Sequence, residues 1–155
     1  SGYHILMVHA DADARTADTA IQERINPGFE RARRTGATSP ELVEVVPIRS
    51  TDAWMLADEI ALAVVLGTTM TRNELGLPPH VRDVERDLNP KSTLQQAIKQ
   101  VEQRSTRRRR IDFESIHSPL AEQIDLNILL QVPAYERYVQ QTHAVLIKLG
   151  FVRDS

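Results

Sequence analysis

The sequence predicts an α/β fold in which a small parallel sheet belongs to the first half and helices fill most of the second half. Residues 5–8 form an unbroken aliphatic run, which is typical of a strand covered on both faces. A second run, rich in β-branched residues, covers residues 42–48, and a segment of helical composition separates the two. Strand, helix and strand in this order form the βαβ pattern, whose parallel pairing needs such a crossover.

The crossover segment starts near Thr16 and is helical in composition as far as Ile25. Asn26 can cap a helix and Pro27 suits its first position, so we expect one broken helix or two short helices that end near Gly36. The second strand contains Pro47, which indicates a sheet edge or the end of the strand.

The second half predicts further helices joined by one long irregular segment. Residues 52–66 predict a helix that Ser50 or Thr51 caps and Gly67 ends. Residues 68–90 are expected to be irregular, with at most short helical turns. Further helices are expected over about 90–103, 118–130 and 133–149, and an arginine-rich connector covers 104–110.

Length and composition predict one compact unit of 155 residues with a formal net charge of −2. We expect residues 1–103 to form the α/β core, and residues 104–155 to pack on it as connector and helices. The chain has no cysteine, which excludes a disulfide, a thiolate zinc site and a cysteine nucleophile. No signal peptide or bilayer-length segment is visible, so we expect a cytoplasmic protein without a membrane partner.

Two carboxylates directly follow the first strand, at Asp11 and Asp13. Ligands of parallel sheets gather at the carboxyl ends of the strands. Residues i and i+2 of an extended chain point the same way, so we expect both aspartates to hold one hard cation, with Mg²⁺ as the first choice and Mn²⁺ as the alternative. Alternatively, either aspartate caps the helix near Thr16. His9 is expected on the same side, as a packed histidine rather than a ligand.

Other charged residues could complete this site. Asp52 follows the second strand and is therefore expected at the same sheet edge as a metal ligand, although an acid in a first helical turn also suits the helix dipole. Lys91 stands at a helix start, where it could meet a phosphate or simply be solvated. Guanidinium groups match phosphate in a bidentate way, so the connector predicts nucleic-acid contacts as the alternative to a solvated linker, at Arg107, Arg108, Arg109 and Arg110.

Three stretches together resemble divergent toprim-like proteins, in particular an uncharacterised branch found in bacterial genome-defence contexts. They are His9-Ala10-Asp11-Ala12-Asp13, the segment from Arg49 to Asp58, and Asn89-Pro90-Lys91. The resemblance covers roughly the first hundred residues. It implies a small parallel α/β fold that uses Mg²⁺ on nucleic-acid phosphodiesters, with the cation held at Asp11 and Asp13.

The chain departs from this family at its catalytic Glu, which lies on an earlier strand and has no counterpart among the ten residues before Asp11. Either an upstream segment supplies this Glu, or the fold binds a partner without the activity. Asp52 stands where the family more commonly has Glu.

Three functions remain open, and with them the question of whether the protein is an enzyme. The first is Mg²⁺-dependent hydrolysis of nucleic acid, with DNA favoured over RNA, in antiviral defence; Asp11 and Asp13 would act catalytically. The second is a non-catalytic interaction module whose helical half binds a partner such as an ATPase, or which forms a homo-oligomer. The third is a phosphatase of the haloacid-dehalogenase type, although Arg15 stands where that pattern has Thr or Val.

Overall fold

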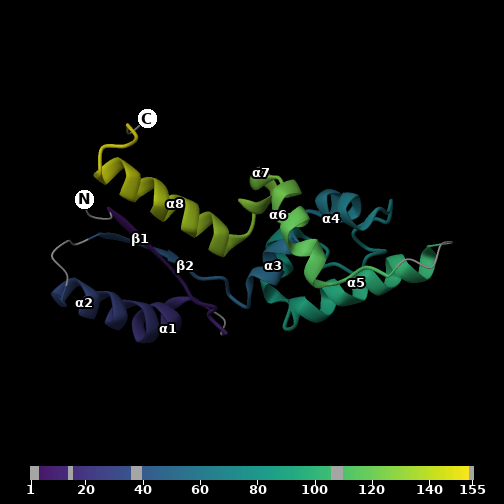
Figure 1. Cartoon of the computed structure of the whole chain (residues 1–155), viewed down its shortest axis with the longest axis horizontal. Coiled ribbons are helices and arrows are strands. Elements are labelled where there is room, and N and C mark those ends of the chain that lie inside the picture. Colours follow the sequence, from purple (N-terminus) through teal and green to yellow (C-terminus); the bar gives the residue numbers. More distant parts are fainter. Residues whose placement is uncertain (1–3, 14–15, 36–39, 106–109, 154–155) are drawn as a thin grey trace. The chain divides into compact units, whose positions relative to one another are not determined.

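A computed structural model describes residues 4–13, 16–35, 40–105 and 110–153 (Figure 1). The chain divides into a sheet unit, Ser1–Ile48 with Pro133–Ser155, and a helical unit, Arg49–Val132. These units differ from the expected division after residue 103, because the helix that starts at Pro133 packs on the second strand. Within the described residues, no helix combines the length and apolar composition that a membrane span requires.

The sheet unit contains two parallel strands, β1 (Ile5–His9) and β2 (Glu41–Val45), in which Ile5 lies opposite Glu41 and His9 opposite Val45. The pairing continues beyond both strands, because Ala10 N–H donates to the Val45 carbonyl at 3.1 Å and Ala12 N–H to that of Pro47 at 2.8 Å. Pro47 therefore takes part only as an acceptor, which its missing N–H allows. The predicted parallel α/β arrangement is confirmed.

The crossover between the strands is one helical run rather than two helices. It comprises α1 (Asp18–Ala20), the π-helical segment η1 (Ile21–Ile25) and α2 (Asn26–Thr35). The expected alternative of one broken helix is therefore confirmed. Asn26 does not cap a new helix, because its φ and ψ are helical at −59° and −45° and its N–H donates to the Ile21 carbonyl. The hydrogen-bond pattern instead changes just before Pro27, which has no N–H to donate to a helix.

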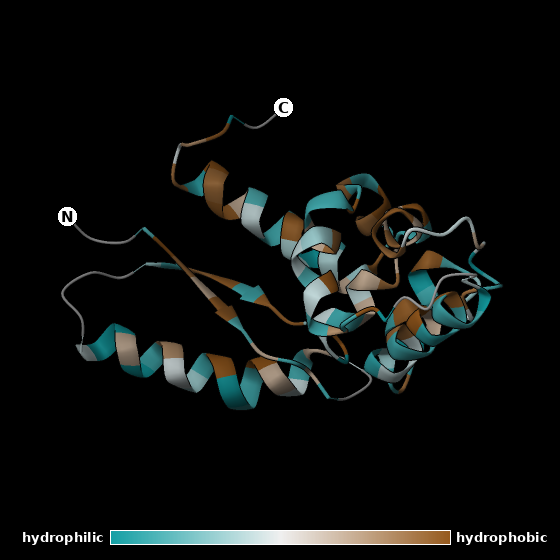
Figure 2. Ribbon diagram, turned by 45° about the vertical axis from the view of Figure 1, so that its right-hand side comes forward, coloured by the Kyte–Doolittle hydropathy of each residue, from teal (hydrophilic) through white to brown (hydrophobic). Residues whose placement is uncertain are grey.

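The strand pair lies between two helical layers, with the α1–α2 run on one side and α8 (Pro133–Lys148) on the other (Figures 1 and 2). Val43 points to the face opposite Leu42 and is fully buried, and α8 packs on β2. The predicted helix 133–149 is confirmed, and Gly150 ends it with φ of 75°. The other face of the sheet packs on the α1–η1 segment through Val8, Ala10, Ala12, Leu42, Val46 and Ile48 against Ala17, Ala20, Ile21 and Ile25.

The helical unit is built around a leucine-rich core that includes Leu56, Leu62, Leu66, Leu75, Leu94 and Leu120. Asn89 caps the predicted helix that Pro90 opens, and residues 68–90 are irregular apart from a short 3₁₀ helix, as expected. The elements of this unit are α3 (Thr51–Met55), α4 (Glu59–Leu66), η2 (Val81–Arg86), α5 (Pro90–Arg104), η3 (Glu114–Ile116), α6 (His117–Gln123) and α7 (Leu126–Leu129).

Two predicted helices are each divided into two. The helix expected over 52–66 stops after Met55 and restarts at Glu59, and the one expected over 118–130 stops at Gln123 and restarts at Leu126. In both places an aspartate precedes the second helix and accepts hydrogen bonds from its first turn: Asp58 before α4 and Asp125 before α7. A capping aspartate favours a helix start over a continuous helix. Gly67 ends α4 in the left-handed conformation, as predicted.

Candidate functional site

The carboxyl end of β1 carries His9 and Asp11, with His9 Nε2 lying 3.5 Å from Asp11 Oδ1. The two residues are two positions apart in a segment whose strand pairing continues to Ala12, so their side chains share one side of the chain. The predicted same-side placement of His9 and Asp11 is confirmed. His9 is not the packed core histidine that we expected, because half of its side chain is exposed.

Asp13 lies beyond the end of the extended segment. Its φ is 52°, in the left-handed region that most residues avoid and that aspartate adopts more readily than most. The alternation that predicted Asp11 and Asp13 on the same side therefore stops before Asp13. The structure leaves Asp13 exposed just past the sheet edge.

Arg24 holds the backbone of the loop that contains the two aspartates. Its Nη2 donates to the carbonyl of Asp11 at 2.6 Å and to that of Ala12 at 3.1 Å. The contact joins the crossover helix to the end of β1 and places a positive charge beside this loop. Sequence reasoning missed Arg24, because a charged residue in a helix usually belongs to a solvated face.

The residues at this edge fit the expected Mg²⁺ ion only in part. Mg²⁺ binds oxygen ligands and keeps several waters, so one or two carboxylates with a substrate phosphate can hold it. Asp11 supplies one such carboxylate at the expected place. In the part of the chain that the structure describes, however, no three His, Asp or Glu side chains come together as a metal site would require. The described residues therefore do not assemble the metal site that the resemblance implies.

Asp52, the third predicted metal ligand, belongs to the helical unit and contacts His117. Asp52 Oδ1 lies 3.4 Å from His117 Nε2, and Ser50 Oγ donates to Asp52 Oδ2 at 3.5 Å. Both side chains are mostly buried, with 19% of Asp52 and 28% of His117 exposed. Asp52 thus sits in the first turn of α3, as the helix-dipole alternative predicted, and holds the start of α6.

Lys91 is the second residue of α5 and lies with its Nζ 5.3 Å from the centre of the Phe113 ring. Phe113 in turn packs edge-on against His117, at 4.8 Å between ring centres. The structure therefore connects Lys91 with Asp52 through two aromatic side chains. The sequence signal for this link is the spacing of four residues between Phe113 and His117, which places side chains together on a helical turn.

The predicted nucleic-acid contacts in the connector can be placed only in part, because Arg107, Arg108 and Arg109 lie outside the described residues. Arg110 is described and exposed.

Arg104, at the end of α5, forms a 2.7 Å ion pair with Glu74. Hydrogen bonds from the Thr71 backbone N–H, and then from Arg104 and the Thr71 hydroxyl, lower the pKa of Glu74 to about 2. Arg104 therefore already has an anionic partner.

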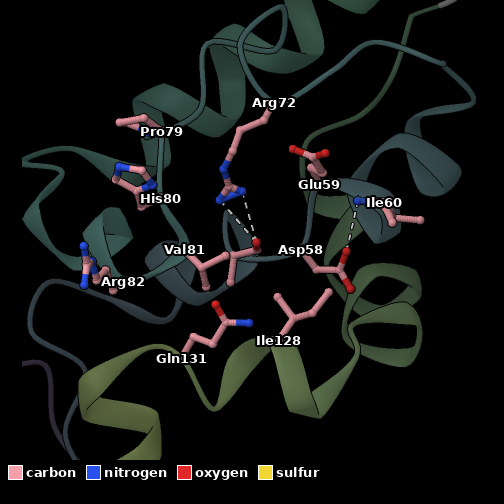
Figure 3. A pocket seen from close by; sticks show the side chains of 11 residues that line it. Asp58, Glu59, Ile60, Arg72, Pro79, His80, Val81, Arg82, Ile128 and Gln131 are labelled. Carbon is pink, nitrogen blue, oxygen red and sulfur yellow. Dashed lines mark hydrogen bonds between the residues drawn. The ribbon is translucent and has the colours of Figure 1, made fainter.

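The helical unit also contains an open pocket of about 520 Å³ (Figure 3). Its charged lining residues are Asp58, Glu59, Arg72 and Arg82, and His80 lies beside them. Figure 3 shows the Arg72 guanidinium directed at backbone oxygen rather than into open space. Sequence reasoning did not predict this pocket.

Two charged groups in the pocket wall stabilise the break between α3 and α4. Arg72 Nε donates to the Pro78 carbonyl at 2.8 Å, and its Nη atoms donate to the carbonyls of Leu56 and Ala57 at distances down to 2.9 Å. Burial lowers the pKa of Arg72, while the charges of Glu59 and Asp58 act in the opposite direction. Asp58 accepts backbone N–H groups with both oxygens. Both groups therefore hold backbone, which favours a structural role over a catalytic one.

The outer edge of β2 is closed by α8. The Glu44 N–H donates to Gln141 Oε1 at 2.9 Å, and Arg137 Nη2 donates to the Val46 carbonyl at 3.4 Å. Lys148 pairs with the Glu41 carboxylate at 2.7 Å. Side chains of α8 thus satisfy backbone groups that would otherwise face an unpaired edge.

Within the part of the chain that the structure describes, no such hydrogen bonds cover the outer edge of β1. The ladder to β2 uses even-numbered residues of the β1 segment, such as His4, Ala10 and Ala12, so the peptide groups of Ile5, Met7 and His9 face outward. Among the described residues, no strand pairs with this side. Met7 is 53% exposed and Leu6 37% exposed. We call this side of β1, formed by Ile5, Met7 and His9, the open edge.

Comparison with known protein families, with curated proteins and with solved structures found no match to this chain.

Proposed function

We propose that this chain is an interaction module that takes an extended protein segment onto the open edge of β1. The observation that carries the proposal is the difference between the two edges of the strand pair. Gln141 and Arg137 close the edge of β2, whereas the open edge presents backbone donors and acceptors in a row. Such a row is a template for an added strand.

The side chains of β1 suit this role. Charged residues and prolines are the usual means of keeping an edge strand from pairing, and residues 5–8 contain neither. Leu6 and Met7 are neighbours, so they point to opposite faces of the sheet, and both are exposed. An added strand would meet an apolar side chain on each face, in addition to the backbone hydrogen bonds.

A non-catalytic role is also supported by how the charged groups are used. Asp58 and Arg72 bind backbone groups, and Asp52 binds His117. These are groups that a catalytic site would need to direct at a substrate. We therefore place the function at the sheet edge rather than in the pocket of the helical unit.

The test uses labelled peptides that copy residues 4–10 and residues 40–46, and fluorescence anisotropy with the whole chain. We expect saturable binding of at least one peptide and weaker binding after N-methylation of alternate residues, because N-methylation removes backbone donors. Met7→Pro should abolish binding without disturbing the ladder to β2, since the Met7 N–H faces outward. If neither peptide binds a chain that sedimentation velocity shows to be monomeric, or if both peptides bind Met7→Pro as well as they bind the original chain, the proposal fails.

Mg²⁺-dependent hydrolysis of nucleic-acid phosphodiesters is a second candidate, and it includes the toprim-like type of the sheet and a role in bacterial defence. The position of Asp11 beside His9 at the carboxyl end of a parallel strand favours it. Lys91 and Arg110, both exposed, would contact the nucleic-acid backbone.

Calorimetric titration with Mg²⁺ and with Mn²⁺ separates the two candidates. The double variant Asp11→Ala/Asp13→Ala is the matched control. Binding heat in the original chain that disappears in the double variant would support the second candidate, and a nuclease assay on DNA and RNA would follow. Equal heats in both proteins would remove the metal, and with it this candidate.

A further inference from the structure

We propose that the occupant of the open edge is a second copy of this chain, with β1 pairing antiparallel to the partner's β1 about a two-fold axis at Met7. The inference rests on the proposed function, since it names the partner for the same edge. The result is a four-stranded sheet in the order β2, β1, partner β1, partner β2.

The outward backbone groups of β1 match this pairing. Ile5, Met7 and His9 are the residues whose peptide groups face the open edge. With Met7 on the axis, Met7 lies opposite the partner's Met7, and Ile5 lies opposite the partner's His9. Each of these pairs is of the hydrogen-bonded kind, so every outward N–H and carbonyl of the three residues gains a partner.

A second copy also leaves no edge of the new sheet uncovered. Both outer strands would be β2, and side chains of α8 already occupy the outer edge of β2 in each copy, through Gln141 and Arg137. A single strand from an unrelated protein would instead become a new edge. Two-fold pairing is closed, because it uses the same surface on both copies.

The side chains of β1 are compatible with self-pairing. Residues 5–8 are uncharged, so no like charges meet across the axis, and His9 lies opposite the aliphatic Ile5 of the partner. Met7 is 53% exposed in the single chain and would pack against the partner's Met7. On the face of the sheet opposite to Met7, Leu6 lies opposite the partner's Val8.

Sedimentation velocity over a range of concentrations tests the association. We expect a monomer–dimer equilibrium in the original chain. Met7→Lys would place two positive charges opposite each other and raise the dissociation constant by about tenfold or more. The matched control is Val64→Lys, because Val64 is 61% exposed on α4, which belongs to the helical unit and contributes no residue to the open edge.

A cysteine variant tests the register. The chain contains no cysteine, so Met7→Cys introduces its only thiol. Residues opposite each other in a hydrogen-bonded antiparallel pair have Cα atoms about 5.5 Å apart, within the range that a disulfide bridges. Mild oxidation should therefore cross-link Met7→Cys much faster than Leu6→Cys or Val64→Cys.

A chain that remains monomeric at all concentrations overturns the inference, as does a dimer that Met7→Lys leaves intact or a cross-linking rate equal in the three cysteine variants. Peptide binding by a strictly monomeric chain would overturn this inference alone and leave the proposed function standing. Loss of peptide binding together with a dimer insensitive to Met7 would overturn both.

Discussion

Asp58 and Asp125 join the starts of two helices, because Asp58 Oδ2 accepts the backbone N–H of Asp125 at 3.0 Å. The other oxygen of Asp58 accepts the N–H groups of Ile60 and Ala61, also at 3.0 Å. Asp125 in turn caps α7 through the N–H of Asn127. A carboxylate that is only 3% exposed thus fixes the first turn of α4 beside the first turn of α7.

Replacing Asp58 should therefore be among the more destabilising single substitutions in the helical unit. Asp58→Ala removes the acceptor of three backbone N–H groups near the core, and we expect a loss of about 2 to 4 kcal/mol. Asp125→Ala is the matched control, because it removes one cap but keeps the backbone N–H that Asp58 accepts, and should cost about 1 kcal/mol. Urea unfolding of the two variants measures both values. Equal losses would contradict the central place given to Asp58.

Arg72 should matter through its shape as well as its charge. Its planar guanidinium reaches the carbonyls of Leu56, Ala57 and Pro78 together. Arg72→Met keeps much of the aliphatic stem but leaves these acceptors without a donor, and we expect a loss of about 2 to 3 kcal/mol. Arg72→Lys should recover only part of it, because an ammonium group cannot span all three positions. Thermal unfolding compares the variants, and full recovery by Lys would show that charge alone is sufficient.

The breaks in the helical unit show where sequence reasoning succeeded and where it stopped. Gly67, Pro90 and Gly150 are local signals, and the structure ends or begins helices at all three. The break at Asp58 depends instead on Arg72 and Asp125, which are distant in the sequence. An aspartate inside an amphipathic stretch reads equally well as a solvated helical residue, so the local pattern could not choose between the two.

The candidate site shows the same boundary. The parallel strands and the position of Asp11 at a strand end follow from local patterns. The left-handed backbone of Asp13 and the contact of Arg24 with the Asp11 carbonyl do not, because a short loop and a helix far along the chain decide them. The open edge was also beyond the sequence, since periodicity identifies strands but not which of their two edges a neighbouring helix covers.

Glu74 should titrate well below an ordinary glutamate. The hydrogen bonds from Thr71 and Arg104 hold its pKa at about 2, from an ordinary value of 4.5. Because the folded pKa is the lower one, the stabilisation is complete above the unfolded pKa and disappears as the pH falls from about 4.5 to about 2. The Thr71 backbone N–H is the largest cause, so Arg104→Ala should raise the pKa only part of the way. NMR titration of the Glu74 carboxyl measures this, and an unchanged pKa in Arg104→Ala would contradict the pairing.

Gln141 should protect the second edge of the sheet, since its Oε1 accepts the outward N–H of Glu44. Gln141→Ala leaves that donor without its partner and should cost about 1 kcal/mol in urea unfolding. Within the described residues, the structure gives the neighbouring Gln140 one side-chain contact, a hydrogen bond to the exposed Glu136. Gln140→Ala is therefore the matched control and should cost about half as much or less.

Gln141→Ala should also change the assembly, because it uncovers the outer edge of β2. A two-fold dimer would then have an uncovered edge at each end of its sheet, where further chains can add. Light scattering should therefore detect species larger than a dimer in Gln141→Ala, and the absence of such species would mean that Arg137 and Lys148 suffice to close the edge.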